Sequence, residues 1–136
     1  MVVGFFYSEC VGDVDVFRHD CLLDLRRHRC VDSEDKDLES AIARELREET
    51  GYQFESFEYL GKTSANPSTH NNWMHFYLAT GGEKNAAQSL DANEEIEIHL
   101  LSIDDVKSLL KKNEILQSMH ATALFYALSK LGELNY

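Results

Sequence analysis

The stretch ARELREETGY, residues 43–52, places three glutamates on little more than one helical turn. Like charges three or four residues apart on a helix repel each other, at a cost of about 0.2–0.5 kcal/mol per pair. A chain that folds this stretch into a helix therefore has to offset the repulsion among Glu45, Glu48 and Glu49. The way in which it does so limits both the fold and the function.

A helix from about Asp37 to Thr50 is predicted around these glutamates. Gly51 follows the last helical residue and is suited to the left-handed conformation that ends many helices. Three side chains are candidates for the N-cap: Asp32, Ser33 and Asp35.

At about 100° per residue, Glu45 and Glu49 fall on the same arc as the apolar side chains of this helix, and Arg44 and Glu48 flank that arc. A solvated acidic face would lie opposite the apolar residues instead. Two interpretations stay open. In one, the glutamates belong to an ordinary charged face on which Arg44 pairs with Glu48 one turn later. In the other, they hold a hard cation, Mg²⁺ or Mn²⁺, through carboxylate oxygens.

Strands and helices alternate along residues 32–136, which predicts a single mixed α/β (α+β) domain. Residues 1–31 show neither clean alternation nor turn signals in the stretch RHDCLLDLRRHRC. The apolar stripe of the last helix is either core or a dimer contact. The predicted strands cover 54–60, 73–80 and 95–101, and the later helices cover 102–112, capped by Ser102, and 114–131.

The net charge of −11 argues against binding to the nucleic-acid backbone. A small anionic substrate stays compatible, because a divalent metal on carboxylates can hold it. No apolar run approaches the ~20 residues that span a bilayer, so no membrane partner is expected. Cys10, Cys21 and Cys30 fit no standard zinc spacing with the nearby histidines, and they predict reduced thiols in the cytoplasm.

The stretch RELREETGY resembles the second half of the Nudix hydrolase signature, G-x5-E-x7-R-E-U-x-E-E-x-G-U, where U is a bulky apolar residue. The loops and strands that follow are similar to those of ADP-ribose and nucleotide-sugar pyrophosphatases in that family. The resemblance implies a Nudix-type α/β/α sandwich with a mixed β-sheet. The matching positions are Arg44, Glu45, Leu46, Glu48, Glu49, Gly51 and Tyr52.

The first half of the signature departs from this pattern. Cys30 stands where the family has its first glycine, and Lys36 stands where it has its first glutamate. Glu34 or Asp35 replaces that glutamate only if the loop shifts. Residues 1–31 do not resemble the opening strands of the family, and we interpret them as a strongly diverged or aberrant segment, such as a shifted reading frame produces. Irregular or missing opening strands are then expected.

The resemblance implies hydrolysis of a nucleoside diphosphate linked to another group, most of all ADP-ribose or an ADP-sugar, with release of AMP. It implies Mg²⁺ or Mn²⁺ as the cofactor, with Glu45 and Glu49 as its ligands. Glu48 is implied as a further ligand or as the base, and Arg44 as the residue that orients the glutamates. The loop residue Glu94 is implied as an additional metal ligand or base, ahead of Glu95 and Asp91.

A second loop, around Pro67, offers Asn66, His70 and Asn72 as substrate contacts, although each fits a plain surface loop as well. Trp73 could stack on a base, but within an apolar strand it is expected in the core. The alternative function is a catalytically impaired Nudix-fold module that binds nucleotides or regulates a partner. A third interpretation is an acidic interaction domain that uses its last helix. The pyrophosphatase branch also implies a homodimer.

Overall fold

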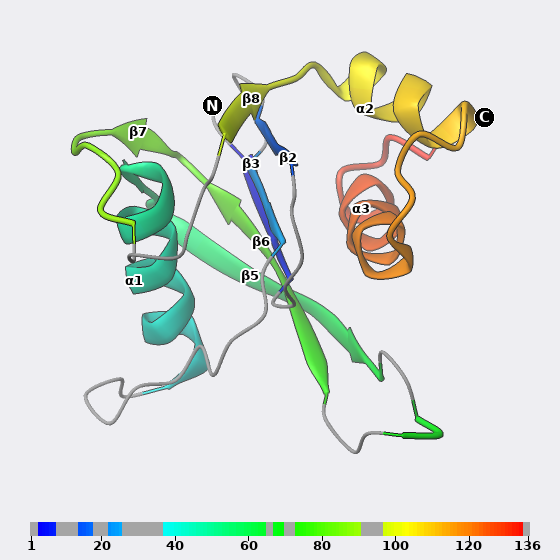
Figure 1. The fold of residues 1–136 in the computed structure, drawn as a ribbon, viewed down its shortest axis with the longest axis horizontal. Helices are drawn as coiled ribbons and strands as arrows, with labels where there is room; N and C mark the ends of the chain where they lie inside the picture. The colour runs from blue at the N-terminus through cyan, green and yellow to red at the C-terminus, as the bar shows by residue number, and fades with distance from the viewer. Residues whose placement is uncertain are drawn as a thin grey trace.

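The structure is a computed structural model that describes residues 3–7, 14–17, 22–25, 37–64, 67–69, 73–90 and 97–134. A six-stranded sheet lies between the helix α1 on one face and the helices α2 and α3 on the other (Figure 1). This arrangement confirms the predicted α/β/α layers. Within the described ranges, no helix is long and apolar enough to cross a membrane.

The sheet is mixed and has the strand order β5-β6-β1-β3-β2-β8. β1 runs parallel to β3, and β2 runs parallel to β8, while the other neighbours are antiparallel. A separate two-stranded sheet pairs β4 (Tyr52–Gln53) with β7 (Glu83–Lys84). The six strands are β1 (Val3–Tyr7), β2 (Val14–Phe17), β3 (Leu22–Leu25), β5 (Ser56–Thr63), β6 (Met74–Thr80) and β8 (Glu97–Leu100).

The segment 1–31 contributes β1, β2 and β3 to the sheet, although its sequence pattern indicated no strand. The expectation of irregular or missing strands is therefore wrong for these three stretches. Their pairing is non-local: Val3 lies opposite Thr80 of β6, and Val14 lies opposite Glu97 of β8. Pairing with distant strands decides strand formation more strongly than local propensity does.

The helix α1 (Leu38–Thr50) has the bounds that the sequence predicted, within one residue. Its N-cap is Asp37, whose side chain accepts a hydrogen bond of 2.8 Å from the backbone N–H of Ser40. The predicted caps Asp32, Ser33 and Asp35 are therefore wrong, because the helix begins after them. Gly51 ends the helix at φ 74°, in the left-handed conformation, and its N–H donates to the carbonyl of Arg47.

Apolar side chains on both faces of the sheet form the core. On one face, Ile42 and Leu46 of α1 pack on Tyr77 and Ala79 of β6. On the other face, α2 (Ile103–Lys111) and α3 (Ser118–Lys130) cover the sheet. The buried residues of this second cluster are Met74, Phe76, Leu78, Val106, Met119, Ala123, Leu124 and Ala127.

The two later helices follow their sequence signals to different extents. Ser102 caps α2 as predicted, and a reciprocal hydrogen bond with Asp105 completes a capping box. α3 begins at Ser118 rather than near Glu114, because Asn113 takes a left-handed conformation (φ 57°) and four residues without regular secondary structure follow, the last of them the extended N-cap Gln117. Most of its apolar stripe is core, while Phe125 stays 50% exposed.

Candidate functional site

The buried carboxylate of α1 belongs to Glu49, which is 5% exposed. It lies one turn after Glu45, on the arc that also carries the fully buried Leu46. Glu48 lies on the exposed flank of the helix. This geometry agrees with the predicted interleaving of glutamates and apolar side chains. Burying a charge is unfavourable unless partners offset it, so Glu49 is an uncommon residue at this position in a purely structural helix.

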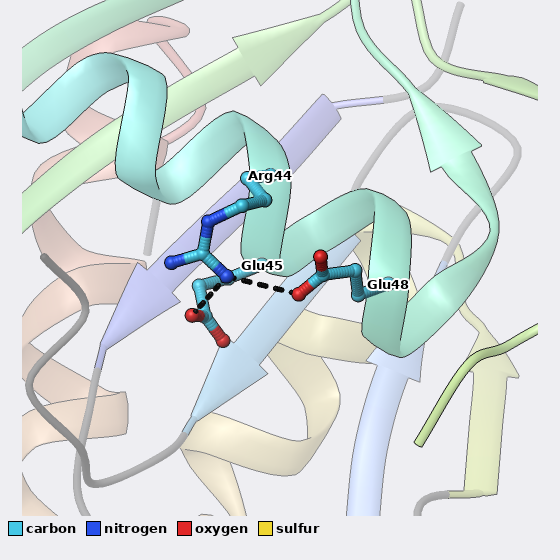
Figure 2. Close-up of polar contacts among 3 residues, drawn as sticks. All are labelled: Arg44, Glu45 and Glu48. Carbon is cyan, nitrogen blue, oxygen red and sulfur yellow. Dashed lines mark hydrogen bonds and ion pairs between the residues drawn. The ribbon is translucent and has the colours of Figure 1, made fainter. Parts of the chain in front are cut away.

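Arg44 offsets the charge of the other two glutamates. Its Nη1 lies 2.8 Å from Oε1 of Glu45 and 2.9 Å from Oε2 of Glu48 (Figure 2). The pair with Glu48, at the i,i+4 spacing, was expected. The pair with Glu45 was missed, since neighbours in sequence do not ordinarily face each other on a helix. One guanidinium therefore holds two carboxylates on the same side of α1.

The segment after β7 turns back and fastens the last turn of α1 (Figure 1). Backbone N–H groups of Asn85 and Ala86 donate to the Gly51 carbonyl, at 3.0 and 3.2 Å. The N–H of Ser89 donates to the Glu48 carbonyl at 2.6 Å, and Nε2 of Gln88 donates to the Glu49 carbonyl at 2.8 Å. Sequence analysis missed this contact, for which the small residues around Ala86 are the available signal.

The approach of this segment depends on Gly51. A Cβ placed on Gly51 would lie 2.2 Å from the backbone oxygen of Ala86, far inside van der Waals contact. The glycine is required twice, by its left-handed conformation and by the close approach of the other chain segment. The close packing at this end of α1 thus depends on one residue without a side chain.

The position of Trp73 differs from the one that the sequence predicted. Trp73 is 56% exposed, so its predicted place in the core is wrong. It lies just before β6, and Nζ of Lys62 stands 4.7 Å from the centre of its ring, a cation–π contact. Nearby, burial and the charge of Lys62 lower the pKa of His75. Lys62 and His75 are paired across β5 and β6, on the face of the sheet where α1 packs on Tyr77 and Ala79.

A model of the NUDIX domain family matches residues 30–122, which is most of the chain. The chain belongs to the Nudix family. The match includes α1 and its glutamates, and it begins at Cys30, so β1 to β3 lie outside it. Nudix membership supports hydrolysis of nucleoside diphosphate derivatives as the general activity of the family.

The chain is also similar to a protein named methanol dehydrogenase activator, from Bacillus methanolicus. The two are 33% identical over 84 residues, which cover 61% of this chain and 45% of the relative. The chain therefore matches less than half the length of that protein. No solved structure matches the chain significantly.

The donor set of this Nudix helix suits a divalent cation. Nudix hydrolases use such metals, and Mg²⁺ and Mn²⁺ favour carboxylate oxygens. The oxygens of Glu45 and Glu48 already face one positive centre, the Nη1 of Arg44. Within the described part of the chain, no three His, Cys, Asp or Glu side chains converge as a metal cluster. The carboxylates of this helix are thus of the type that the metal prefers, but in the described residues they do not converge, and Arg44 supplies the positive charge beside Glu45 and Glu48.

The loop residues of the prediction lie outside the described residues. These are the carboxylate candidates Glu94, Glu95 and Asp91, and the substrate candidates Asn66, His70 and Asn72. The altered positions Cys30 and Lys36 lie outside them as well. The described site consequently consists of α1, its Arg44 pairs, and the segment that fastens its end.

Proposed function

We propose that the chain is a divalent-metal-dependent hydrolase of a nucleoside diphosphate linked to another group. The substrate class is ADP-ribose or an ADP-sugar, and AMP is one product. The observation that supports this most directly is the buried Glu49, one turn after Glu45, on a helix whose Arg44 also holds Glu48. A helix that only packs on a sheet does not need three carboxylates there.

The roles follow from exposure and contacts. Glu45, Glu48 and Glu49 would hold Mg²⁺, which, when bound, neutralises the diphosphate and lowers the pKa of water. The Glu48 side chain is 47% exposed, so it can accept the proton of the attacking water. Arg44 orients Glu45 and Glu48 through its two ion pairs. Glu94 is proposed as a further carboxylate, and Asn66, His70 and Asn72 as substrate contacts.

In this reaction the oxygen of water bonds to phosphorus, and the bond from that phosphorus to the bridging oxygen breaks. ADP-ribose then gives AMP and ribose 5-phosphate. The negative net charge supports a small nucleotide rather than a nucleic acid as the partner. A cytoplasmic location and a homodimer belong to the same proposal.

The decisive experiment measures AMP release from ADP-ribose with Mg²⁺, in the native chain and in Glu49→Gln. We expect the substitution to lower turnover by about a hundredfold or more, because it replaces a charged ligand. Glu39→Gln is the matched control, since Glu39 lies in the first turn of the same helix and is exposed. Equal turnover in the native chain and Glu49→Gln, or none across a panel of ADP-sugars, contradicts the proposal.

A second candidate function is a Nudix-fold module that binds nucleotides and regulates a partner without turnover. It is supported by the name of the similar protein, an activator of methanol dehydrogenase, and by Cys30 and Lys36 in the altered half of the signature. Calorimetric binding of ADP-ribose without AMP release would support this function. A rise in the rate of methanol dehydrogenase on addition of the chain would support it further.

A further inference from the structure

The carbonyl groups at the C-terminal end of α1 need hydrogen-bond donors. The last four carbonyls of a helix have no partner within the helix, and the helix dipole is negative at this end. Glu48 and Glu49 lie in that last turn, so their own charges add to the unfavourable potential. Donors from outside the helix are therefore worth more here than at an uncharged helix end.

The segment 85–89 supplies such donors to both glutamates. The N–H of Ser89 donates to the carbonyl of Glu48, and the side-chain amide of Gln88 donates to the carbonyl of Glu49. The contact at Gln88 comes from a side chain, whereas the contacts at Asn85, Ala86 and Ser89 come from the backbone. Gln88 is thus the member of this group that a substitution can remove by itself.

We propose that Gln88 is a positioning residue for the carboxylates of α1. Its amide fixes the backbone of Glu49, from which the buried carboxylate projects. Gln88 acts through Glu49 and does not itself contact metal or substrate. This inference rests on the proposed hydrolase function, since it assigns Glu49 to the metal.

Asn85 provides a matched control within the same segment. Its side-chain amide also donates a hydrogen bond of 2.7 Å, but to Oε1 of Gln53 on β4 rather than to α1. Gln88→Met and Asn85→Leu each remove one neutral amide, keep the approximate size and leave the charge unchanged. A role in fold stability alone predicts similar effects for the two variants, whereas positioning of Glu49 predicts different ones.

The first measurement is hydrogen exchange in the metal-free protein. We expect Gln88→Met to speed exchange of the Ser89 and Gly51 amides by about fivefold, the equilibrium effect of one lost part-buried hydrogen bond. Asn85→Leu should leave both amides at the native rate. Unchanged exchange in Gln88→Met overturns the proposal.

The second measurement is Mn²⁺ affinity, from the spin-resonance signal of free Mn²⁺. We expect Gln88→Met to bind Mn²⁺ about fivefold more weakly, and kcat for ADP-ribose to fall while KM stays near the native value. Lys107→Met controls for lost stability, because it breaks the 2.7 Å ion pair with Glu133, and neither residue belongs to α1 or to the segment 85–89. Equal weakening in Lys107→Met or Asn85→Leu overturns the proposal.

The two measurements separate this inference from the proposed function. Absence of Mn²⁺ binding and of turnover in the native chain overturns the hydrolase proposal and, with it, the assignment of Gln88 to a metal site. Amide exchange in the metal-free protein then decides whether Gln88 fixes the backbone of Glu49. Native Mn²⁺ binding with an unaffected Gln88→Met variant overturns the positioning role alone.

Discussion

The helices α1 and α3 lie on opposite faces of the sheet and have the same length, 13 residues, but they bury different chemistry. α3 buries Ala123, Leu124, Ala127 and Leu128, all at 3% exposure or less. α1 buries Leu46 together with a carboxylate and a hydroxyl. The face under α3 is therefore apolar core apart from the buried His120, while the face under α1 combines core with a buried carboxylate.

The ends of the two helices also differ in their polar contacts. α3 has no side-chain hydrogen bond at its N-cap, Gln117. α1 is capped by the Asp37 side chain, ended by Gly51 and fastened by the segment 85–89. Packing is sufficient to hold a helix whose buried face is almost entirely apolar. A helix that carries charges on its packed side needs polar contacts at its ends to hold the same orientation.

The largest expected contrast separates stability from activity on the two faces. Leu124→Ala should lower the free energy of unfolding by about 3 kcal/mol, since it leaves a cavity in a tightly packed site. Its AMP release per folded molecule should stay native. Glu49→Gln should do the reverse, lowering turnover by about a hundredfold or more while changing stability by less than about 1 kcal/mol.

Urea denaturation and AMP release on both variants test this contrast. Val106→Ala, another buried residue of the α3 face, serves as the control for loss of apolar contact without charge. A Leu124→Ala protein that is stable but inactive would show that the two faces are not separable.

The end of α1 should be more sensitive to an added methyl group than the end of α3. Gly51→Ala should lower the free energy of unfolding by about 2 kcal/mol or more, because it adds the left-handed penalty to a clash with Ala86. Gly132→Ala is the matched control, since Gly132 has φ 72° but meets nothing within 4 Å. It should cost about 1 kcal/mol. Equal losses in thermal melts of the two variants would mean that the contact with Ala86 gives way easily.

The α3 face should respond to mild acid through His120. Burial lowers the pKa of His120 from 6.5 to about 4, so the unfolded chain binds its proton first as the pH falls. This contribution to stability is complete above about pH 6.5 and is lost progressively down to about pH 4, with a slope of at most about 1.4 kcal/mol per pH unit. Denaturation of the native chain and His120→Gln at several pH values measures it. Parallel curves for the two proteins between pH 4 and 6.5 would contradict this role.

Sequence analysis predicted α1 well because its signals are local. The periodicity of Leu46 and Glu49 and the glycine at 51 each depend on residues within one or two turns, as does the cap Ser102 of α2. The N-cap was misplaced by a few residues, as Asp37 competes with several similar acidic and hydroxyl side chains nearby. The sequence therefore predicted that the helix forms and which of its faces is buried, but not the residue at which it begins.

The features that sequence analysis missed are tertiary. The strands β1 and β2 pair with β6 and β8, more than 70 residues later along the chain, and β3 is held between β1 and β2. The contact of Gln88 with α1 joins residues 39 positions apart. Trp73 is exposed although the strand that follows it is apolar, so its exposure depends on the tertiary packing around it. Periodicity and capping rules use neighbouring residues only, so they do not predict contacts between residues so far apart in the chain.

The smallest effect concerns Arg44, which tests how α1 offsets its charges. Arg44→Met should lower the free energy of unfolding by about 0.5–1 kcal/mol in metal-free buffer at low salt, since two partly exposed ion pairs are lost and Glu45 and Glu48 repel. Mg²⁺ should restore more stability to this variant than to the native chain, because the cation then supplies the missing positive charge. Lys130→Met, which breaks the exposed ion pair between α3 and Glu58, is the matched control and should not respond to Mg²⁺. Equal responses of the two variants to Mg²⁺ would mean that the metal acts as general ionic strength, and that the charges of α1 are balanced by Arg44 alone.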